Sequence, residues 1–350
     1  MYGQKNDLGE HLIGQVSLPT VSVVIAAFSL NRWGDLREAV ASVRAQTVQV
    51  LETVVVIDHN PELMAKAASE LPEVTVVANA GLRGASGARN TGVAGSRGQV
   101  LAFLDDDAVA RSNWLEALLQ HFTDPSVVGV GGRLEPLWKT CRPRWFPLEF
   151  DWAVGCSYRG MPESATRVRN VWSNNMAIRR HAFDAVGGFR IGFGKVGARS
   201  RPEDTDLCLR AAECNGGGIW IYEPNAIAGH QVPAERTTLS YFLKRCYYEG
   251  QGKAALASFN GVTESTSTER QYARHVLPHA VVRGLLETAR GEASGMARSC
   301  AIIVGLSFAT AGFLADRAVG QAMARREISR TRPNSRPMKK AMSRRRRGVR

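Results

Sequence analysis

Apolar runs and amphipathic stretches alternate along the first third of the chain. The apolar runs are rich in β-branched residues, which is typical of strands buried on both faces. These runs are residues 21–28, 53–58, 74–79 and 99–107. The stretches that can form helices after them are residues 34–46, 61–71, 85–96 and 113–122. This alternation predicts an α/β fold with a doubly wound, mostly parallel sheet.

The second half of the chain is less regular. Residues 171–189 predict a strand and then a helix that stops at a Gly-Gly pair, and residues 218–224 predict another strand. A flexible glycine-rich loop is expected at residues 192–200, immediately before a helix. From about Pro233 the pattern is helical and rich in Arg and Lys.

The pattern divides the chain into four predicted parts. Residues 1–19 are a polar extension without the basic and apolar regions of a signal peptide. Residues 20–235 form the folded α/β domain, and residues 236–324 form a helical C-terminal region. Residues 325–350 form a basic tail that we expect to be disordered.

The net charge of +13 is concentrated at the C-terminus. From Arg325 onward twelve Lys and Arg residues accompany one Glu, so this tail carries +11. The rest of the chain is close to neutral, and the basic character therefore does not indicate a nucleic-acid-binding fold. The tail is suited to an anionic lipid surface or to nucleic acid, and it is equally compatible with a solvated end.

A charge-free run at residues 299–315 is about one residue short of the roughly 18 that indicate a spanning helix. Because it is rich in Ala and Gly, we expect a buried or interfacial helix. The six cysteines are scattered without a C-x-x-C pair, which favours buried thiols in a reducing cytosol over a zinc or redox site. We therefore expect a cytoplasmic protein whose C-terminal region is suited to the inner face of the cell membrane.

Three consecutive carboxylates, Asp105, Asp106 and Asp107, end the fourth predicted strand. Side chains alternate along an extended chain, so Asp105 and Asp107 are expected to face one crevice and Asp106 the other way. Two convergent carboxylates favour a hard divalent cation whose shell is completed by substrate phosphates. The alternative is acidic capping of the next helix, but capping needs one Asp, and Ser112 or Asn113 can supply it.

Asp58 ends the second predicted strand, at the same edge of the sheet, where a carboxylate commonly accepts hydrogen bonds from a ribose or base. The alternative is a turn-forming Asp. The glycine-rich residues 81–92 contain Arg83 and Arg89, and an arginine there can contact phosphate or base. Their G-x-x-G-x-x-G spacing follows the third strand, so they match a dinucleotide-binding fingerprint poorly.

Glu203 and Asp204 stand at the start of a predicted helix, after the glycine-rich loop. Adjacent carboxylates beside a closed site are suited to general-base catalysis, whereas the alternative is acidic helix capping that includes Asp206. His230 follows a predicted strand, and a lone histidine is more often structural than a metal ligand.

Taken together and in this order, the motifs resemble those of family 2 glycosyltransferases, the inverting nucleotide-sugar enzymes of GT-A fold. The resemblance extends from about Val21 to Val232. It is carried by the segments VSVVIAAFSLNRWGDLREAVASVRAQT, VVVID, GASGARNTGVAGSRGQVLAFLDDDAV, NNMAIRRHAFDAVGGF, PEDTDLCLR and AGHQV. It implies a nucleotide-binding half at residues 20–110 and an acceptor half at residues 111–235.

The resemblance implies specific roles at the nucleotide. Ala27 and Phe28 are expected to line the base pocket, Asp58 to bind the nucleoside, and Arg89 to reach the base or diphosphate. The family's opening strand usually continues into Pro-Thr-Tyr-Asn, whereas this chain has Ala-Ala-Phe-Ser from Ala26, which removes an aromatic hydroxyl from the expected base contact.

The resemblance also implies a metal site and a base. Asp105 and Asp106 are expected to bind the nucleotide sugar, and Asp105 and Asp107 to hold Mg²⁺ or Mn²⁺ with help from His230. Asp204 is expected to deprotonate the acceptor hydroxyl, with Glu203 as the alternative base; these six residues complete the candidate site.

The expected reaction is transfer of a single sugar from a nucleoside-diphosphate sugar to a carbohydrate, lipid-linked or small-molecule acceptor. Such a reaction belongs to the synthesis of glycans, glycolipids or natural-product glycosides. The Q-x-x-R-W signature of processive polysaccharide synthases is absent after His230, which favours a single transfer. We expect contact with anionic membrane and no specific nucleic-acid partner.

Two other functions fit parts of the sequence. A D-x-D-x-V phosphohydrolase would use Asp105 as nucleophile, but that motif usually follows the first strand rather than the fourth. A non-catalytic nucleic-acid-binding protein would use the basic tail, but it leaves the carboxylates at the strand ends unexplained.

Overall fold

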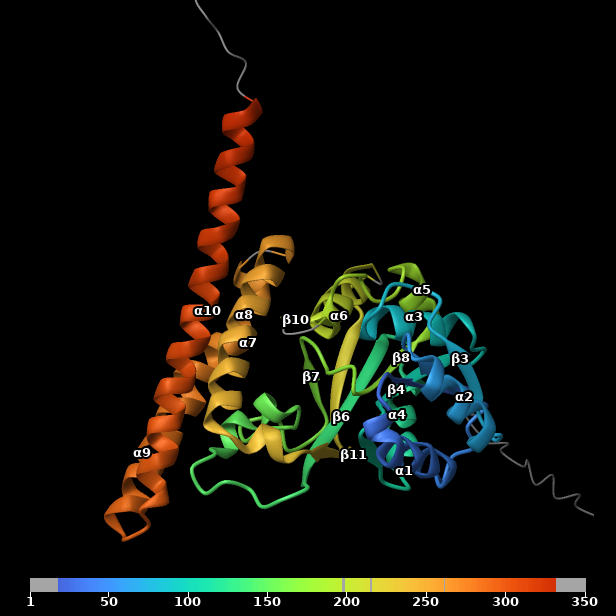
Figure 1. Cartoon of the computed structure of the whole chain (residues 1–350), viewed down its shortest axis with the longest axis horizontal. Helices are drawn as coiled ribbons and strands as arrows, with labels where there is room; N and C mark the ends of the chain where they lie inside the picture. The colour runs from blue at the N-terminus through green and yellow to red at the C-terminus, as the bar shows by residue number, and fades with distance from the viewer. Residues whose placement is uncertain (1–17, 197–198, 215, 261, 332–350) are drawn as a thin grey trace, which may run out of the picture.

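The computed structural model describes residues 18–331 except 197–198, 215 and 261. A nine-stranded sheet lies at the centre of an α/β domain, and a group of long helices stands along one side of it (Figure 1). The strands of the sheet are β1 (Val21–Ala27), β2 (Glu52–Ile57), β3 (Thr75–Ala78), β4 (Val100–Asp105), β5 (Ala108–Ala110), β6 (Val127–Trp138), β7 (Thr166–Val168), β8 (Asn175–Arg179) and β11 (Ile219–Val232). Their order is β3-β2-β1-β4-β8-β6-β11-β5, and β7 pairs with β11.

The α/β fold class is confirmed, and the sheet is mixed. The pairs β1–β2, β1–β4 and β2–β3 are parallel, as the sequence predicts for the first half. In the second half β8 runs antiparallel to both β4 and β6, and β5 and β7 run antiparallel to β11. A parallel pair needs a crossover, whereas β6 and β8 are joined by a segment whose only helix is the 3₁₀ helix η3 (Leu148–Val154), and the chain returns in the opposite direction.

The two faces of β1 pack into two separate cores, because successive side chains of a strand point to opposite faces. Val23 and Ile25 face the core that contains the first set of helices below, whereas Val24 faces the core that contains the second set. The first set is α1 (Trp33–Arg44), α2 (Pro61–Glu70) and α4 (Trp114–Leu119). The second set is α3 (Ala85–Ala94), α5 (Arg180–Ala185) and α6 (Glu203–Cys214).

The glycine-rich segment before α6, predicted as a loop, contains a short hairpin. Its strands are β9 (Gly194–Val196) and β10 (Arg199–Arg201). The Ser86 hydroxyl donates to the Phe193 carbonyl at 2.9 Å, which fastens the start of this segment to α3. The hairpin ends at Arg201, immediately before the residues that begin α6.

The C-terminal region is helical, as predicted. It consists of the 3₁₀ helix η4 (Ala234–Thr237), α7 (Leu239–Asn260), α8 (Val262–Gln271), the π-helix η5 (Tyr272–Val276), α9 (Leu277–Ala289) and α10 (Ser294–Thr331). Because α10 continues to Thr331, the first residues that we expected in a disordered tail are helical. The rest of the tail and residues 1–17 lie outside the described residues.

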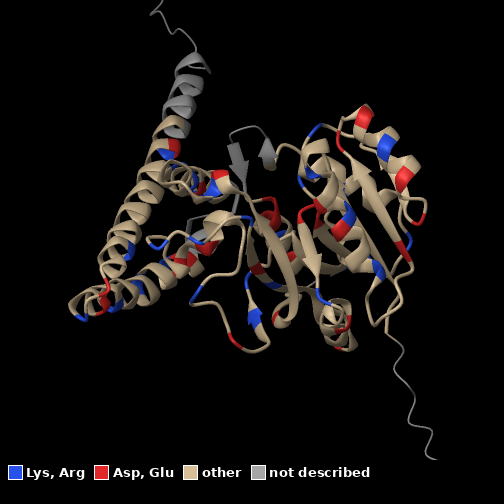
Figure 2. Cartoon of the chain, turned by 60° about the horizontal axis from the view of Figure 1, so that its bottom comes forward, with Lys and Arg blue, Asp and Glu red and all other residues tan. Residues whose placement is uncertain are grey.

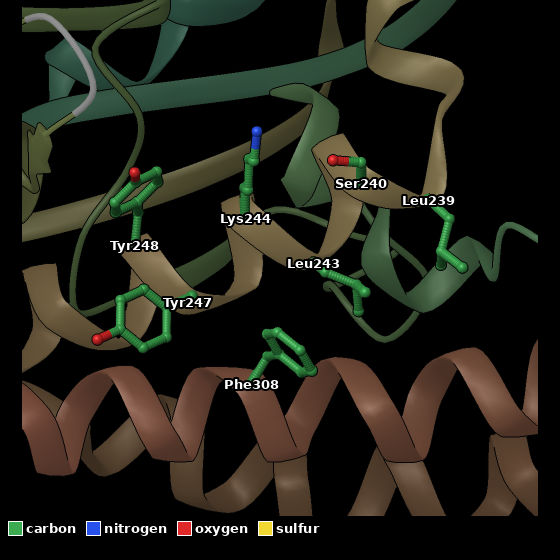
Figure 3. Close-up of a pocket in the computed structure, with 7 residues that line it drawn as sticks. All are labelled: Leu239, Ser240, Leu243, Lys244, Tyr247, Tyr248 and Phe308. Carbon is green, nitrogen blue, oxygen red and sulfur yellow. The ribbon is translucent and has the colours of Figure 1, made fainter.

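Two glycines allow α7 and α10 to pack closely. A Cβ at Gly250 would lie 1.9 Å from the Ala309 carbonyl oxygen, and one at Gly312 would lie 2.0 Å from the Tyr247 carbonyl oxygen. Further along the same pair of helices, Phe308 of α10 points toward α7 (Figure 3). Any side chain at the two glycines would therefore push the helices apart.

An aromatic cluster joins the C-terminal helices to the α/β domain. Phe242 of α7 is fully buried, and its ring centroid lies 5.3 Å from those of Phe146 and Phe150 and 5.5 Å from that of Trp145. Gly305 of α10 faces Phe150 and Phe242, so α10 closes over the same cluster. Burial of these rings is an apolar contact that holds α7 and α10 against the domain.

By length and composition one segment within the described part of the chain, Ser294–Val319 of α10, is apolar enough to cross a membrane. Most of this segment is not buried by the rest of the protein. In Figure 2 most of the described length of α10 is tan, the colour of uncharged residues. Helices of this length and composition also occur in proteins that never enter a membrane.

Candidate active site

The site lies at the carboxyl ends of the central strands, where Figure 2 shows acidic residues in red. Asp105 is the last residue of β4, and Asp106 and Asp107 form the turn into β5. β5 pairs with β11 so that Ala108 stands opposite His230, and the Gln231 backbone N–H donates to the Asp107 carbonyl at 2.8 Å. This pairing brings His230 beside the aspartates across more than a hundred residues of sequence.

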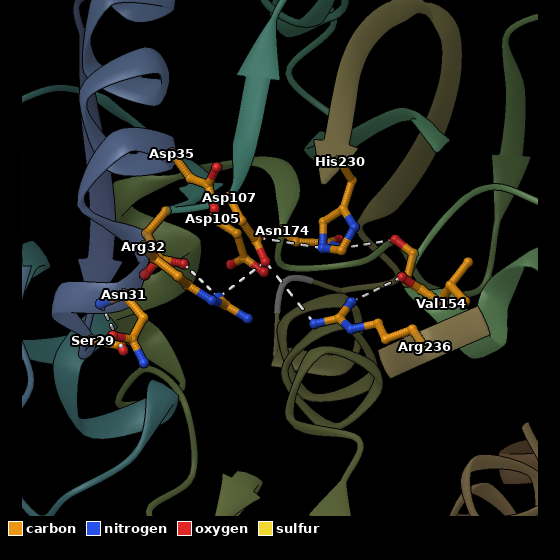
Figure 4. A network of polar contacts seen from close by, with 12 residues as sticks. Ser29, Asn31, Arg32, Asp35, Asp105, Asp107, Val154, Asn174, His230 and Arg236 are labelled. Atoms are coloured by element: carbon orange, nitrogen blue, oxygen red, sulfur yellow. Dashed lines mark hydrogen bonds and ion pairs between the residues drawn. The ribbon is translucent and has the colours of Figure 1, made fainter. Parts of the chain in front are cut away.

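Asp105, Asp107 and His230 converge, as the sequence predicts. One ligand atom from each lies within 4.8 Å of the others (Figure 4). Asp107 Oδ1 is buried without a hydrogen-bond partner in the described structure, and it lies 3.4 Å from His230 Nε2. Burial lowers the pKa of His230, which favours the neutral imidazole that can coordinate a metal. Two carboxylates, one of which has an unpaired oxygen, and one neutral imidazole fit a divalent cation.

Arg32 and Arg236 are site residues that the sequence analysis missed. Arg32 Nη1 lies 2.8 Å from Asp106 Oδ1 and 3.0 Å from Asp107 Oδ2. Arg236 Nη2 lies 4.0 Å from Asp107 Oδ2, and its Nη1 donates to the Val154 carbonyl at 3.1 Å. Arg32 follows the end of β1 by a few residues, and Arg236 follows the end of β11 in the same way. A basic residue shortly after a strand that ends at the site is therefore the sequence signal that could have identified both.

The expected alternation of the three aspartates is wrong in one respect. β4 ends at Asp105, so Asp106 and Asp107 lie in a turn and both contact Arg32. Burial raises the pKa of Asp106 to about 7, although Arg32 acts against this increase. Asp106 is 2% exposed, which leaves little of its surface for a ligand.

Arg89 connects the two acidic motifs of the site. Its Nη2 donates to Asp105 Oδ1 at 2.8 Å, and its Nη1 donates to Glu203 Oε1 at 3.1 Å. The guanidinium is buried and lies 5.5 Å from the centroid of the Phe189 ring. Burial opposes its charge, but the two carboxylates outweigh burial and raise the pKa of Arg89. Its predicted contact with base or diphosphate stays a prediction.

Glu203 and Asp204 begin α6, yet their contacts differ. Glu203 is held by Arg89, and burial together with the charge of Asp204 raises the pKa of Glu203 to about 7. Asp204 Oδ1 accepts the Thr205 backbone N–H at 2.6 Å. Burial also raises the pKa of Asp204, against the opposing effect of Lys253 on α7. Asp204 therefore accepts a backbone N–H in the first turn of α6, which is part of the capping role that the sequence offers as the alternative.

Asp58 supports the loop that precedes α3. Its carboxylate accepts the Asn79 Nδ2 at 2.6 Å and the Gly84 backbone N–H at 2.9 Å, and it lies 2.9 Å from His59 Nδ1. Burial alone would raise the pKa of Asp58, but these hydrogen bonds outweigh it and lower the pKa. These contacts support the alternative in which Asp58 stabilises a turn. Its contact with the nucleoside stays a prediction.

Ala27 and Phe28 lie at the carboxyl end of β1, next to the aspartates. Ala27 is buried, whereas Phe28 is 48% exposed. The Arg32 guanidinium lies 5.1 Å from the centroid of the Phe28 ring. An exposed aromatic ring beside a cation offers a stacking surface for a base. The base pocket expected at Ala27 and Phe28 stays a prediction.

Known proteins identify the class to which this fold and site belong. The model of glycosyl transferase family 2 matches residues 22–187. Glucosyl-dolichyl phosphate glucuronosyltransferase of Haloferax volcanii is 34% identical over 67% of this chain and 77% of its own length. Succinoglycan biosynthesis protein ExoM of Rhizobium meliloti is 29% identical over 62% of this chain and 69% of its own length.

A solved structure shows the same fold. The mannosyltransferase PcManGT of Pyrobaculum calidifontis, in complex with GDP-Man and Mn²⁺, has a TM-score of 0.52 and 15% identity. The match covers 83% of this chain and 86% of that one. The chain therefore belongs to glycosyl transferase family 2, with a GT-A fold, and is a transferase.

Proposed function

We propose that the chain transfers one sugar from a nucleoside-diphosphate sugar to a lipid-phosphate-linked acceptor, with inversion at the anomeric carbon. The acceptor class is supported by the named substrate of the Haloferax volcanii relative, a glucosyl-dolichyl phosphate. Contact with anionic membrane is supported by the exposed apolar segment of α10 and the basic residues after it. In this proposal the reaction takes place at the cytoplasmic face of a membrane.

One observation carries the proposal. Asp107 Oδ1 is buried without a described hydrogen-bond partner in a cluster with Asp105 and His230. An unsatisfied buried carboxylate oxygen is costly, so the geometry favours a ligand at this point. Mg²⁺ or Mn²⁺ held there would neutralise charge on the diphosphate as it leaves.

The chain's own residues position and activate the two substrates. Arg89 is held between Asp105, one of the carboxylates that would hold the cation, and Glu203. Arg32 and Arg236 add two more positive charges beside Asp107, suited to the phosphates of the donor. A diphosphate is thus surrounded by cations from three separate segments.

Asp204 is the general base of the proposed reaction. Glu203 is occupied by Arg89, whereas the described hydrogen bonds of Asp204 come from the adjacent Thr205. The raised pKa of Asp204 makes it a stronger proton acceptor than an ordinary aspartate once it is ionised. It takes the acceptor proton as the acceptor oxygen attacks the anomeric carbon from the face opposite the diphosphate.

Calorimetry with nucleotides tests the proposal directly. UDP, GDP and dTDP are titrated into the purified chain with and without Mn²⁺, beside an Asp107→Ala variant. Metal-dependent binding of one nucleotide, lost in the variant, is the expected result. A matched Asp35→Ala variant, which removes a carboxylate that pairs with Lys139, should bind as the unaltered chain does. Binding without metal, or none, would contradict the proposed site.

A further inference from the structure

A groove of about 500 Å³ lies between α7 and α10. Its lining residues are Leu239, Ser240, Leu243, Lys244, Tyr247, Tyr248 and Phe308 (Figure 3). All but Phe308 come from the first half of α7. Leu239 is 52% exposed and Phe308 is 39% exposed, so the groove presents apolar surface that the described protein leaves open.

The α7 side of the groove has two chemically different rows. Residues four apart share a helix face, so Leu239, Leu243 and Tyr247 form an apolar row next to Phe308. Ser240, Lys244 and Tyr248 form the neighbouring row, and Figure 3 shows Lys244 and Tyr248 on the side of α7 turned away from α10. The groove is therefore amphiphilic, with an apolar floor and a polar rim.

The cation on this rim has no described ionic partner. α7 carries three cations, and two of them pair with carboxylates: Arg245 with Glu249, and Lys253 with Glu269. For Lys244 the described structure contains no ion pair, and its side chain is exposed. An anion at the rim would meet this charge without displacing an existing carboxylate.

The groove is close to the proposed active site along the chain. Arg236, which approaches Asp107, lies just before α7, and Lys244 follows Leu239 by about 7 to 8 Å of helix. At its other wall, Phe308 belongs to the charge-free segment of α10, where Ile303 and Val304 are also exposed. The groove is thus bounded by the helix that follows Arg236 in the sequence and by the helix that carries this exposed apolar segment.

Resting on the proposed function, we infer that this groove binds the hydrocarbon chain of the lipid-linked acceptor, with the acceptor phosphate at Lys244. The apolar row and Phe308 contact the chain, and the rim receives the anionic head. Charge complementarity favours this occupant over a second copy of the protein, because a helix packed into the groove would cover the unpaired Lys244.

Photolabelling of the full chain tests the inference without any transferase reaction. The probe is geranylgeranyl phosphate with a diazirine in its chain, and labelled peptides are identified by mass spectrometry. Labels are expected on α7 near Leu243 and on α10 near Phe308. Unlabelled geranylgeranyl phosphate should compete at least about tenfold better than geranylgeraniol, because Lys244 binds the phosphate. Inorganic phosphate alone should not compete.

Two variants and one matched control give the test its specificity. Phe308→Ser should weaken labelling about tenfold by removing apolar contact. Lys244→Gln should remove the preference for the phosphate over the alcohol. Leu314→Ser removes a more exposed apolar side chain of α10 outside the groove and should leave labelling unchanged. Equal loss in the control would indicate non-specific adsorption to α10 and would overturn the inference.

The remaining outcomes separate the inference from the proposed function. Metal-dependent nucleotide binding without groove labelling would remove the inference and leave the proposed function standing. Groove labelling without nucleotide binding would remove the proposed function and leave the groove as a lipid-binding site. If light scattering shows a dimer that Phe308→Ser dissociates, and no labelling occurs, the occupant is a second copy and the inference is wrong.

Discussion

The catalytic end of the sheet and the C-terminal helices are stabilised in different ways. At the sheet, buried charges meet opposite charges: Arg89 holds Asp105 and Glu203, and Arg32 holds Asp106 and Asp107. The C-terminal helices instead use aromatic rings and close contacts at glycines, and they leave an apolar face exposed. This difference agrees with the proposals above, in which one region holds charged ligands and the other meets apolar ones.

The largest expected effect concerns the base. Asp204→Asn should lower kcat by about 10²- to 10⁴-fold while the donor Kd stays unchanged, because only proton transfer is lost. Transferase kinetics and nucleotide calorimetry measure the two quantities separately. Glu203→Gln is the matched control, since it removes the neighbouring carboxyl group that Arg89 holds. A full loss of kcat in Glu203→Gln alone would assign the base to Glu203.

The aromatic junction provides the largest expected effect on stability. Phe242→Ala leaves a cavity among Phe146, Phe150 and Trp145 and should lower the free energy of unfolding by about 3–5 kcal/mol. Urea denaturation measures this change. Val282→Ala, at an exposed position of α9, should cost far less. If the two variants are equally stable, the rings do not fix α7 to the domain.

Truncation before Arg325 should separate membrane contact from donor binding. Each Lys or Arg near an anionic membrane contributes about 1 kcal/mol, so loss of the tail should reduce binding to phosphatidylglycerol vesicles well over tenfold. Sedimentation with vesicles measures the bound fraction, and calorimetry should show unchanged nucleotide affinity. Retention of the truncated chain on the vesicles would remove the tail from this role.

The smallest expected effect is a shift in the pH dependence of kcat, caused by the charge of Lys253 on α7 acting on Asp204. Lys253 of α7 opposes the burial that raises the pKa of Asp204, so Lys253→Met should raise this pKa further. The base acts when deprotonated, so kcat rises with pH, and the rise should move to higher pH in the variant. Lys253→Arg keeps the charge and should keep the unaltered profile. Coincident profiles for Met and Arg would show that α7 does not influence the base.

Much of the first half was predictable, because local patterns there agree with the fold. β-branched runs followed by helical stretches place β1 to β4 and α1 to α3 close to their observed bounds. The carboxyl ends of β1, β2 and β4 then meet at one edge, which brings Asp58 and Asp105 to the same side of the sheet. These inferences need only periodicity and the rule for parallel strands.

Other features depended on contacts between distant segments. The directions of β8 and β5 follow from the path of the chain between strands, which periodicity does not encode. The orientation of Asp106 differs from expectation because β4 ends two residues earlier than the predicted strand, at Asp105. The pairing of Arg89 with Glu203 joins residues 114 positions apart. Charge and residue type alone predict none of these contacts.

The sequence by itself determined the fold class, the position of the acidic motifs at strand ends, and the family to which the chain belongs. These depend on short-range spacing and on the order of motifs. Only the tertiary structure decided that Asp107 Oδ1 is buried beside His230, that Arg32 and Arg236 approach it, and that α7 and α10 enclose an amphiphilic groove. The physical reason is that burial and charge pairing are properties of packed surroundings, which distant parts of the chain supply together.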